Sequence, residues 1–177
     1  MTIVFRWRSW YLYGYCRLKK EYRLFRISRI QDPEALPERF LRRDRSLEEF
    51  IAGTIGEAYG ELMGYLQRQG LEMSGYPFVL YHNSDMEALD AEAGFSVDRV
   101  VPGEGRVQPG TIPGGEVLSA IHTGPYTTLE KTYTPVMAHI EKEGLKVTDW
   151  MYELYLNSPE DTPENQLQTE ICFPLES

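Results

Sequence analysis

Apolar positions recur with helical spacing in two segments of the chain, residues 57–71 and 131–145. They lie at i, i+3, i+4 and i+7, which places them on one face of an amphipathic helix. Each segment ends at a glycine, Gly70 or Gly144. Glycine is the residue that most readily adopts the left-handed conformation that follows a helix. The pattern therefore predicts two helices that end at these glycines.

The two helical segments also resemble each other. EAYGELMGYLQRQGL aligns with KTYTPVMAHIEKEGL without a gap, so that Tyr59 matches Tyr133 and Met63 matches Met137. The same register continues through the glycines and into the segments that follow. A chance similarity would not hold its register across helix, glycine, strand and turn, so the alignment indicates an internal duplication.

Strand-like segments follow each helix in the same register. Residues 78–84 match residues 152–158, and both segments are rich in aromatic and β-favouring residues and end in Asn-Ser. This composition is typical of a strand closed by a turn. After four inserted residues, residues 92–97 match residues 170–175, which we interpret as the next strand of each copy.

A leading strand is predicted before each helix, at residues 117–123 in the second copy and, less clearly, at residues 39–45 in the first. Each unit is then strand–helix–strand–strand. Two such units predict an α+β domain with an antiparallel sheet and two helices. The repeats span about residues 36–100 and 116–177, and a stretch rich in proline and glycine, residues 101–115, forms the linker between them.

Charge divides the chain near residue 32, close to the start of the first repeat. Residues 1–31 carry eight basic side chains and one acidic one, whereas the remainder carries ten basic and 26 acidic side chains. Residues 10–18 and 22–30 are two β-rich runs joined by a short charged turn, which predicts an N-terminal β-hairpin. We interpret residues 1–31 and 36–177 as two differently built parts.

Composition narrows the function classes further. The net charge of −9 argues against a protein that mainly binds nucleic-acid phosphates. Two cysteines are too few for a disulfide scaffold, and the three histidines lack the Cys/His spacing of a structural zinc site. No apolar run approaches the roughly 20 residues of a membrane span. We expect a soluble cytoplasmic protein with no membrane contact, no metal and no cofactor.

The two copies differ most sharply where Glu153 matches Val79. Side chains alternate along a strand, so Glu153 shares a face with Tyr155, and Val79 shares the matching face with Tyr81. If a pseudo-twofold axis relates the copies, these four residues approach one another near it. A carboxylate among aromatic rings suits an apolar cation, because each ring contributes about 0.5–2 kcal/mol of cation–π attraction. The alternative is that Glu153 faces solvent, as isolated glutamates in strands usually do.

Motifs in both halves resemble those of a known family. The second half contains HTGPY, Tyr133, ELYLNSP and TEICFPL, and the first contains IGEAYGEL, PFVLYH and EAGFSV. Over about residues 36–177 these motifs resemble the GyrI-like small-molecule-binding domain, the effector-binding module also attached to AraC-type and MerR-type multidrug regulators. The resemblance implies a duplicated strand–helix–strand–strand domain with a groove between its two copies.

The resemblance also implies a binding site. In that family a glutamate in the E-x-Y strand lies in an aromatic pocket and contacts lipophilic cations, a role that carries over to Glu153. Trp150 is a weaker candidate, because such a tryptophan more often belongs to a core. The candidate ligand-binding residues are Glu153, Tyr155, Tyr81, Tyr126, Phe78 and Trp150.

Residues 1–31 resemble a second family. Trp10-Tyr11-Leu12, followed by GYCRL and YRLFRISRI, is similar to the middle of a WYL domain. WYL domains are the sensor modules of many bacterial regulators, and their arginines contact nucleotide or nucleic-acid ligands. A full WYL domain has earlier strands and usually a preceding helix-turn-helix, so we interpret this segment as a truncated fragment. Because an isolated hairpin is marginally stable, it either docks on the main domain or is a remnant without a ligand.

Three functions follow from these observations. The first is binding of hydrophobic, often cationic, small molecules by a sensor, a sequestering protein or the effector domain of a transcription regulator. The second is hydrolysis of a cyclopropanoid or related electrophile, which some relatives in the resembled family perform, with Glu153 and Tyr155 as catalytic residues. The third is an acidic module that docks on gyrase or on a regulatory protein. We expect no direct DNA binding, because no helix-turn-helix is recognisable.

Overall fold

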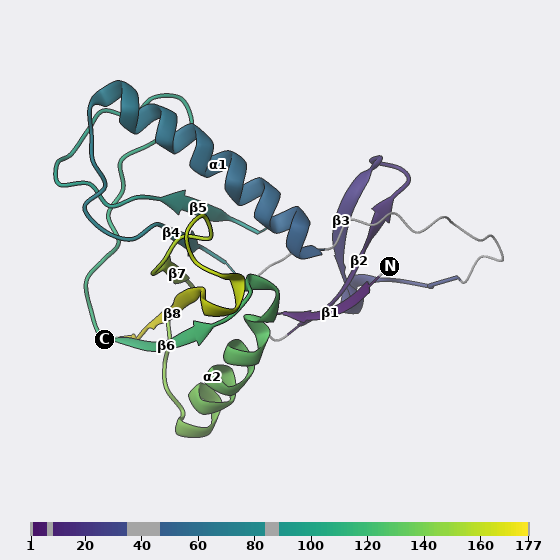
Figure 1. Cartoon of the computed structure of the whole chain (residues 1–177). Helices are drawn as coiled ribbons and strands as arrows, with labels where there is room; N and C mark the ends of the chain where they lie inside the picture. The colour runs from purple at the N-terminus through teal and green to yellow at the C-terminus, as the bar shows by residue number, and fades with distance from the viewer. Residues whose placement is uncertain (1, 7–8, 35–46, 84–88, 177) are drawn as a thin grey trace.

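The computed structural model describes residues 2–6, 9–34, 47–83 and 89–176, and Figure 1 draws the remaining residues as a thin grey trace. Within the described residues the chain forms a five-stranded sheet with two helices and a separate three-stranded sheet. The predicted α+β class, with an antiparallel sheet, two helices and an N-terminal hairpin, is confirmed. No described helix has the length and apolar character that a membrane crossing requires.

The five-stranded sheet is antiparallel at every pairing, with the order β5-β4-β7-β8-β6. Its central pair, β4 and β7, comes from different repeats, so the two repeats share one continuous sheet. The strands are β4 (Phe78–Tyr81), β5 (Ala91–Gly94), β6 (Val117–Thr123), β7 (Met151–Tyr155) and β8 (Gln168–Pro174). The leading strand predicted at residues 39–45 lies outside the described residues.

The helices α1 (Leu47–Gln69) and α2 (Glu130–Glu143) end where the sequence predicted. Gly70 and Gly144 follow them with φ angles of 61° and 63°, in the left-handed region that favours glycine. Helix α1 begins at Leu47 and so extends further toward the N-terminus than the segment 57–71 in which the apolar spacing is regular. Glycines near the beginning of α1 weaken the helical pattern there.

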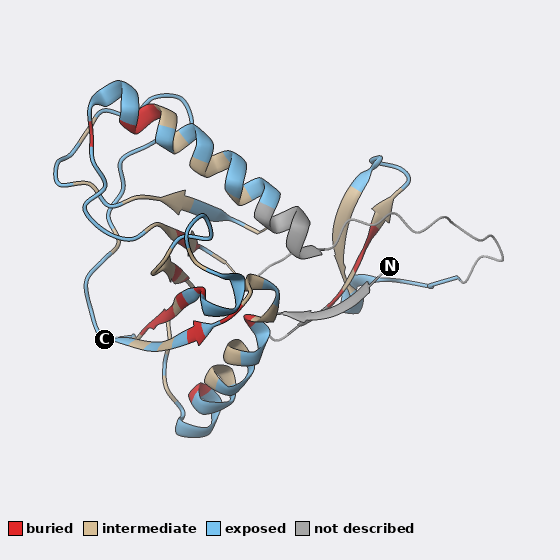
Figure 2. Cartoon of the chain, in the orientation of Figure 1, coloured by how far each residue is buried: buried red, intermediate tan, exposed pale blue. Residues whose placement is uncertain are grey.

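Both helices pack on the same face of the five-stranded sheet. The core under them contains Val79, Ile171 and Phe173 from the sheet and Ile140 from α2, all nearly inaccessible to solvent. Tyr59 of α1 packs against the same core. Figure 2 shows buried segments in red on strands of the five-stranded sheet and on both helices. Because side chains alternate along each strand, the face away from the helices carries the other half of the sheet residues.

The end of α1 has a smaller core of its own. Tyr65, Leu66 and Leu71 are buried there against apolar side chains that include residues of the linker between the repeats. The Tyr65 hydroxyl donates to the carbonyl of Pro102, and the Arg68 guanidinium lies 3.0 Å from the Glu104 carboxylate. Apolar contacts, a hydrogen bond and an ion pair therefore connect the linker to the C-terminal end of α1.

The N-terminal part forms three antiparallel strands, β1 (Thr2–Arg6), β2 (Ser9–Cys16) and β3 (Glu21–Arg26). The pair β2–β3 is the predicted hairpin, and β1 adds a strand that the sequence analysis did not predict. Tyr11 and Tyr13 are buried, and the Tyr13 ring stacks on Tyr22 with 5.1 Å between centroids. Figure 1 shows this sheet apart from the five-stranded one.

Candidate ligand-binding site

A buried carboxylate lies at the centre of the five-stranded sheet. Glu153 of β7 retains only 4% of its solvent exposure, and three tyrosine hydroxyls donate hydrogen bonds to it. Tyr81 and Tyr155 donate to Oε2 at 3.2 Å and 3.1 Å, and Tyr133 donates to Oε1. A buried carboxylate is stabilised only when such donors replace the water that it loses.

Strand register and alternation account for this convergence. Val79 of β4 is paired with Glu153 of β7, so their side chains leave the sheet on the same face. Tyr81 and Tyr155 lie two residues further along their strands and therefore point the same way. Tyr133 reaches the carboxylate from α2, which covers that face. Both repeats thus contribute donors to one glutamate.

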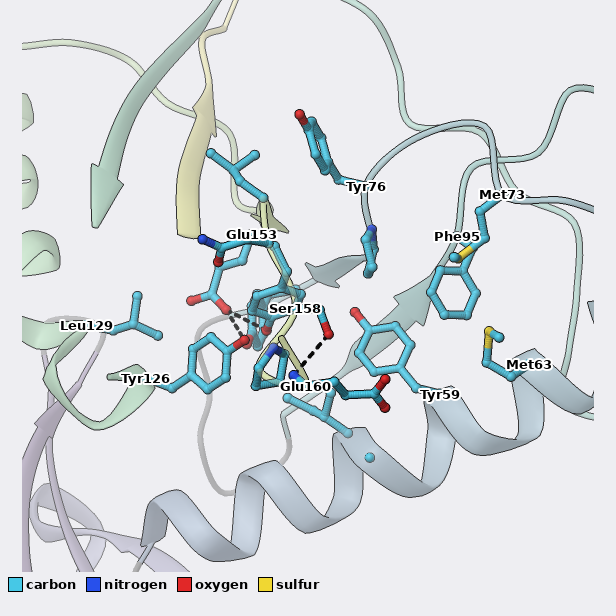
Figure 3. A pocket seen from close by; sticks show the side chains of 18 of the residues that line it. Tyr59, Met63, Met73, Tyr76, Phe95, Tyr126, Leu129, Glu153, Ser158 and Glu160 are labelled. Atoms are coloured by element: carbon cyan, nitrogen blue, oxygen red, sulfur yellow. Dashed lines mark hydrogen bonds between the residues drawn. The ribbon is translucent and has the colours of Figure 1, made fainter. Parts of the chain in front are cut away.

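A cavity of about 730 Å³ opens beside Glu153, between the sheet and α1. In Figure 3, Glu153, Tyr126 and Leu129 lie toward one end of it and Met63, Met73 and Phe95 toward the other. Its lining is predominantly apolar and aromatic, and the charged side chains among the described lining residues are Glu153 and Glu160. A cavity of this size and character is typical of sites for drug-sized molecules.

Aromatic rings form a connected wall along the cavity. The Tyr155 ring lies edge-on to Tyr126, with 5.5 Å between centroids, and edge-on to Tyr59 at 6.4 Å. Tyr59 in turn contacts Phe95 at 5.1 Å. The Tyr59 hydroxyl donates to the carbonyl of Phe78 at 2.7 Å, and this hydrogen bond fixes the Tyr59 ring against the first residue of β4. The wall therefore presents ring faces and edges whose positions are set by neighbours.

The phenols around Glu153 keep their protons at neutral pH. Burial raises the pKa of Tyr133 and of Tyr155 well above the usual 10.0, and the nearby negative charge of Glu153 raises both further. The same two causes raise the pKa of Tyr59 and of Tyr126. The four hydroxyl groups are therefore neutral donors that can stabilise a carboxylate without adding charge to the cavity.

A histidine fixes the turn that carries Tyr126. The buried His122 lies with Nδ1 2.8 Å from the Thr132 hydroxyl and Nε2 3.1 Å from the Thr128 hydroxyl. The Thr128 hydroxyl donates to the carbonyl of Pro125 at 2.8 Å. These contacts hold the short 3-10 turn η2 (Tyr126–Thr128), and so place the Tyr126 ring on the cavity wall.

Four of the six sequence-predicted residues line the cavity: Glu153, Tyr155, Tyr81 and Tyr126. Phe78 and Trp150 are not among the lining residues. Phe78 precedes Val79 on β4 and so belongs to the opposite face of the sheet, and its ring lies over Gly94. The Trp150 ring stacks on Tyr152, which alternation also places on that face.

Sequence reasoning did not propose Tyr59 and Tyr133 as site residues, although both line the cavity. The signal for them was present, because these two tyrosines are the matched positions of the duplicated helices. Equivalent helix positions on one face of a shared sheet converge on its centre. Within the described part of the chain, no three His, Cys, Asp or Glu side chains are grouped closely enough to hold a metal ion.

Comparison with known families supports both resemblances found in the sequence. The model of the GyrI-like small molecule binding domain matches residues 40–176, and the model of the WYL domain matches residues 1–35. The first match covers most of the chain.

One curated relative is described as a transcriptional regulator. The chain is 36% identical over 47 residues to the uncharacterized HTH-type transcriptional regulator YobV of Bacillus subtilis (strain 168), a match that covers 27% of this chain and 15% of YobV. The chain thus matches only a small part of that relative's length.

Solved structures of EcmrR have a similar fold. The crystal structure of the EcmrR C-terminal domain superposes with a TM-score of 0.60 and 26% identity, covering 72% of this chain and 81% of that one. EcmrR in the cryo-EM structure of the EcmrR–DNA complex in EcmrR-RPo gives a TM-score of 0.59 and 26% identity, covering 69% of this chain and 50% of that one.

Proposed function

Because the chain belongs to the family of GyrI-like small molecule binding domains, we propose that it binds hydrophobic cations in the cavity beside Glu153 and acts as an effector-binding module in transcription regulation. The observation that carries this proposal is the buried Glu153 carboxylate, which three neutral phenols surround at the end of an aromatic cavity. The residues that bind the ligand in this proposal are Glu153, Tyr155, Tyr81, Tyr126, Tyr59 and Tyr133.

The charge of the site favours a cation over a neutral molecule. The hydrogen bonds from Tyr81, Tyr133 and Tyr155 favour the charged form of Glu153, and the apolar walls of the cavity screen a charge at that position poorly. A ligand cation gains Coulomb attraction there and cation–π attraction from Tyr126 and Tyr59. A neutral ligand of the same shape gains only dispersion and the burial of its apolar surface.

The regulatory part of the proposal rests on the relatives. YobV is described as an HTH-type transcriptional regulator, and EcmrR has been observed in complex with DNA. We assign the sensing step to this chain: it binds the ligand in the cavity, and ligand binding then changes the activity of a DNA-binding partner. Its net charge of −9 disfavours direct contact with DNA phosphates, so the expectation of no direct DNA binding stays a prediction. Docking on gyrase also stays a prediction.

Titration of the full chain with tetraphenylphosphonium and with rhodamine 6G, followed by calorimetry and fluorescence polarisation, tests the binding proposal. We expect Glu153→Gln to lower the affinity for both cations about 10- to 100-fold. The substitution removes an opposite charge in low-dielectric surroundings but keeps the shape of the side chain. The matched control is Glu141→Gln on the exposed surface of α2, which we expect to leave affinity unchanged. Equal affinities in Glu153→Gln and the unaltered chain refute the role of the carboxylate.

Hydrolysis is the second candidate, favoured by the contact of the Glu153 carboxylate with the phenols of Tyr133 and Tyr155. A carboxylate can accept a proton from an attacking water while a phenol donates one to the departing carbon. Mass spectrometry of a cyclopropanoid substrate after incubation with the protein distinguishes the candidates. Ring-opened product carrying one added water, absent with Glu153→Gln, supports catalysis, whereas substrate recovered intact at stoichiometric protein supports binding alone.

A further inference from the structure

A second carboxylate, Glu160, lines the same cavity but faces solvent. It belongs to the segment after β7, of which residues 156–160 all contribute to the lining. A turn fixes its position: the Ser158 hydroxyl accepts from the Glu160 backbone N–H at 3.2 Å, and the Ser158 carbonyl accepts from the Thr162 N–H at 3.0 Å. Pro159 restricts the backbone between them. The turn therefore positions the backbone of Glu160 at the cavity, and Figure 3 labels Glu160 among the lining side chains.

The two carboxylates have contrasting surroundings. Glu153 is 4% exposed and bound by phenols, whereas Glu160 is exposed. The lining also includes apolar side chains that are open to solvent, with Met63 at 48%, Met73 at 46% and Tyr76 at 53% exposure. These side chains give the cavity an apolar mouth that a small ligand confined beside Glu153 would not cover. Flexible methionines adapt to ligand bodies of different shape.

We propose that Glu160 forms a second cation subsite and that the preferred ligands are amphiphilic dications, with one positive group at Glu153, the other at Glu160 and an apolar linker along the cavity wall. This inference rests on the proposed function and names its ligand class. Tyr59, which lies on the lining and contacts the rings of Tyr155 and Phe95, supplies aromatic surface for the linker.

The exposed carboxylate has a different effect from the buried one. Solvent and salt screen Glu160, so a contact with it strengthens binding by a small factor, about fivefold at low ionic strength. The contribution of Glu153 is larger because its surroundings are apolar. A dication therefore binds more tightly than a monocation of the same body, and the difference shrinks as salt is added.

The test uses calorimetry on the full chain with alkyltrimethylammonium ions and with bis-trimethylammonium alkanes of the same chain lengths. We expect the dication of matching length to bind about tenfold more tightly than its monocation, because the about fivefold factor from Glu160 multiplies the about twofold factor from its two equivalent head groups. Glu160→Gln reduces that advantage to the about twofold factor that two equivalent head groups give any dication, and it leaves the monocation unchanged. Glu164→Gln, an exposed charge on the same loop outside the lining, is the control and retains the full advantage.

Two results overturn the subsite. In the first, the dication binds the unaltered chain no more than about twofold more tightly than the monocation. In the second, Glu160→Gln lowers the affinities for the monocation and the dication by the same factor, which shows only a long-range effect of the Glu160 charge. The proposed function fails separately. In that case neither ligand class binds the unaltered chain, or both bind Glu153→Gln as well as the unaltered chain.

Discussion

Val79 and Glu153 lie opposite each other in the pairing of β4 with β7, and they are matched positions of the two repeats. When equivalent residues of antiparallel strands are paired, the local twofold axis passes between them. Both side chains are buried, with 1% and 4% exposure. The duplicated fold therefore brings two equivalent positions together at its centre, and only one of them carries a charge. Tyrosines from both repeats can then converge on that single carboxylate.

A second glutamate at position 79, opposite Glu153, should destabilise the fold. We expect Val79→Glu to lower the free energy of unfolding by about 3–5 kcal/mol at neutral pH, because a second buried carboxylate faces the first. Burial and Glu153 both raise the pKa of the introduced carboxyl group above its unfolded value of about 4.3. The folded state then binds more protons than the unfolded one above that pH. The penalty is thus small in acid and grows as pH rises.

Urea unfolding of Val79→Glu at several pH values checks this expectation. The control is Ser119→Glu, which introduces the same side chain at an exposed position on β6. A penalty in Val79→Glu that stays constant across the acid range would contradict the charge argument and point to steric misfit alone.

The donors to Glu153 should contribute to stability as well as to binding. We expect Tyr133→Phe to reduce the free energy of unfolding by about 1–3 kcal/mol, because a buried carboxylate loses a hydrogen bond that no water replaces. Tyr76→Phe removes a hydroxyl from a residue that is 53% exposed and should leave the stability unchanged. Thermal denaturation of the two variants compares them directly, and equal midpoints would show that the hydrogen bond to Glu153 adds nothing.

The central features of the fold could be predicted from the sequence because the duplication supplies a second copy of each signal. The helix ends at Gly70 and Gly144 and the strand β6 follow from local pattern and match the structure. The approach of Val79 to Glu153 follows from the repeat register combined with strand alternation. These predictions rest on the helical spacing of apolar residues and on the alternation of side chains along strands, and tertiary packing preserves both periodicities.

The rest of the site depends on packing that local pattern does not record. Whether Tyr133 reaches Glu153 depends on how α2 is placed over the sheet. Whether the Tyr59 ring reaches Tyr155 depends in the same way on the placement of α1. Phe78 is one of the six candidate residues from the sequence, yet strand alternation places it on the face opposite the cavity. Glu160 lies in an acidic loop that reads as a solvated turn, and only the folded chain brings it to the cavity.

Alkaline pH should loosen the domain through the cavity tyrosines. Burial and Glu153 raise the pKa of Tyr133 and Tyr155 above the value of 10.0 that the unfolded chain has. Above pH 10 the unfolded state therefore loses these protons first, so their stabilising contribution is present below about pH 10 and is lost as pH rises further. We expect phenolate absorbance from these residues to appear together with unfolding. Tyr155→Phe should lose less stability over the same range, and an identical pH dependence in that variant would contradict the assignment.

Two glycines should respond to alanine in opposite directions. A Cβ at Gly94 of β5 would overlap the ring of Phe78, whereas a Cβ at Gly60, on the exposed surface of α1, would meet no atom within 4 Å. We expect Gly94→Ala to cost about 1–3 kcal/mol through displacement of that ring, and Gly60→Ala to gain about 0.5–1 kcal/mol from higher helix propensity. Urea unfolding measures both free energies. Because neither residue lines the cavity, cation affinity should stay unchanged in both variants, and a loss of binding in Gly60→Ala would show that the site needs a more flexible α1 than its contacts suggest.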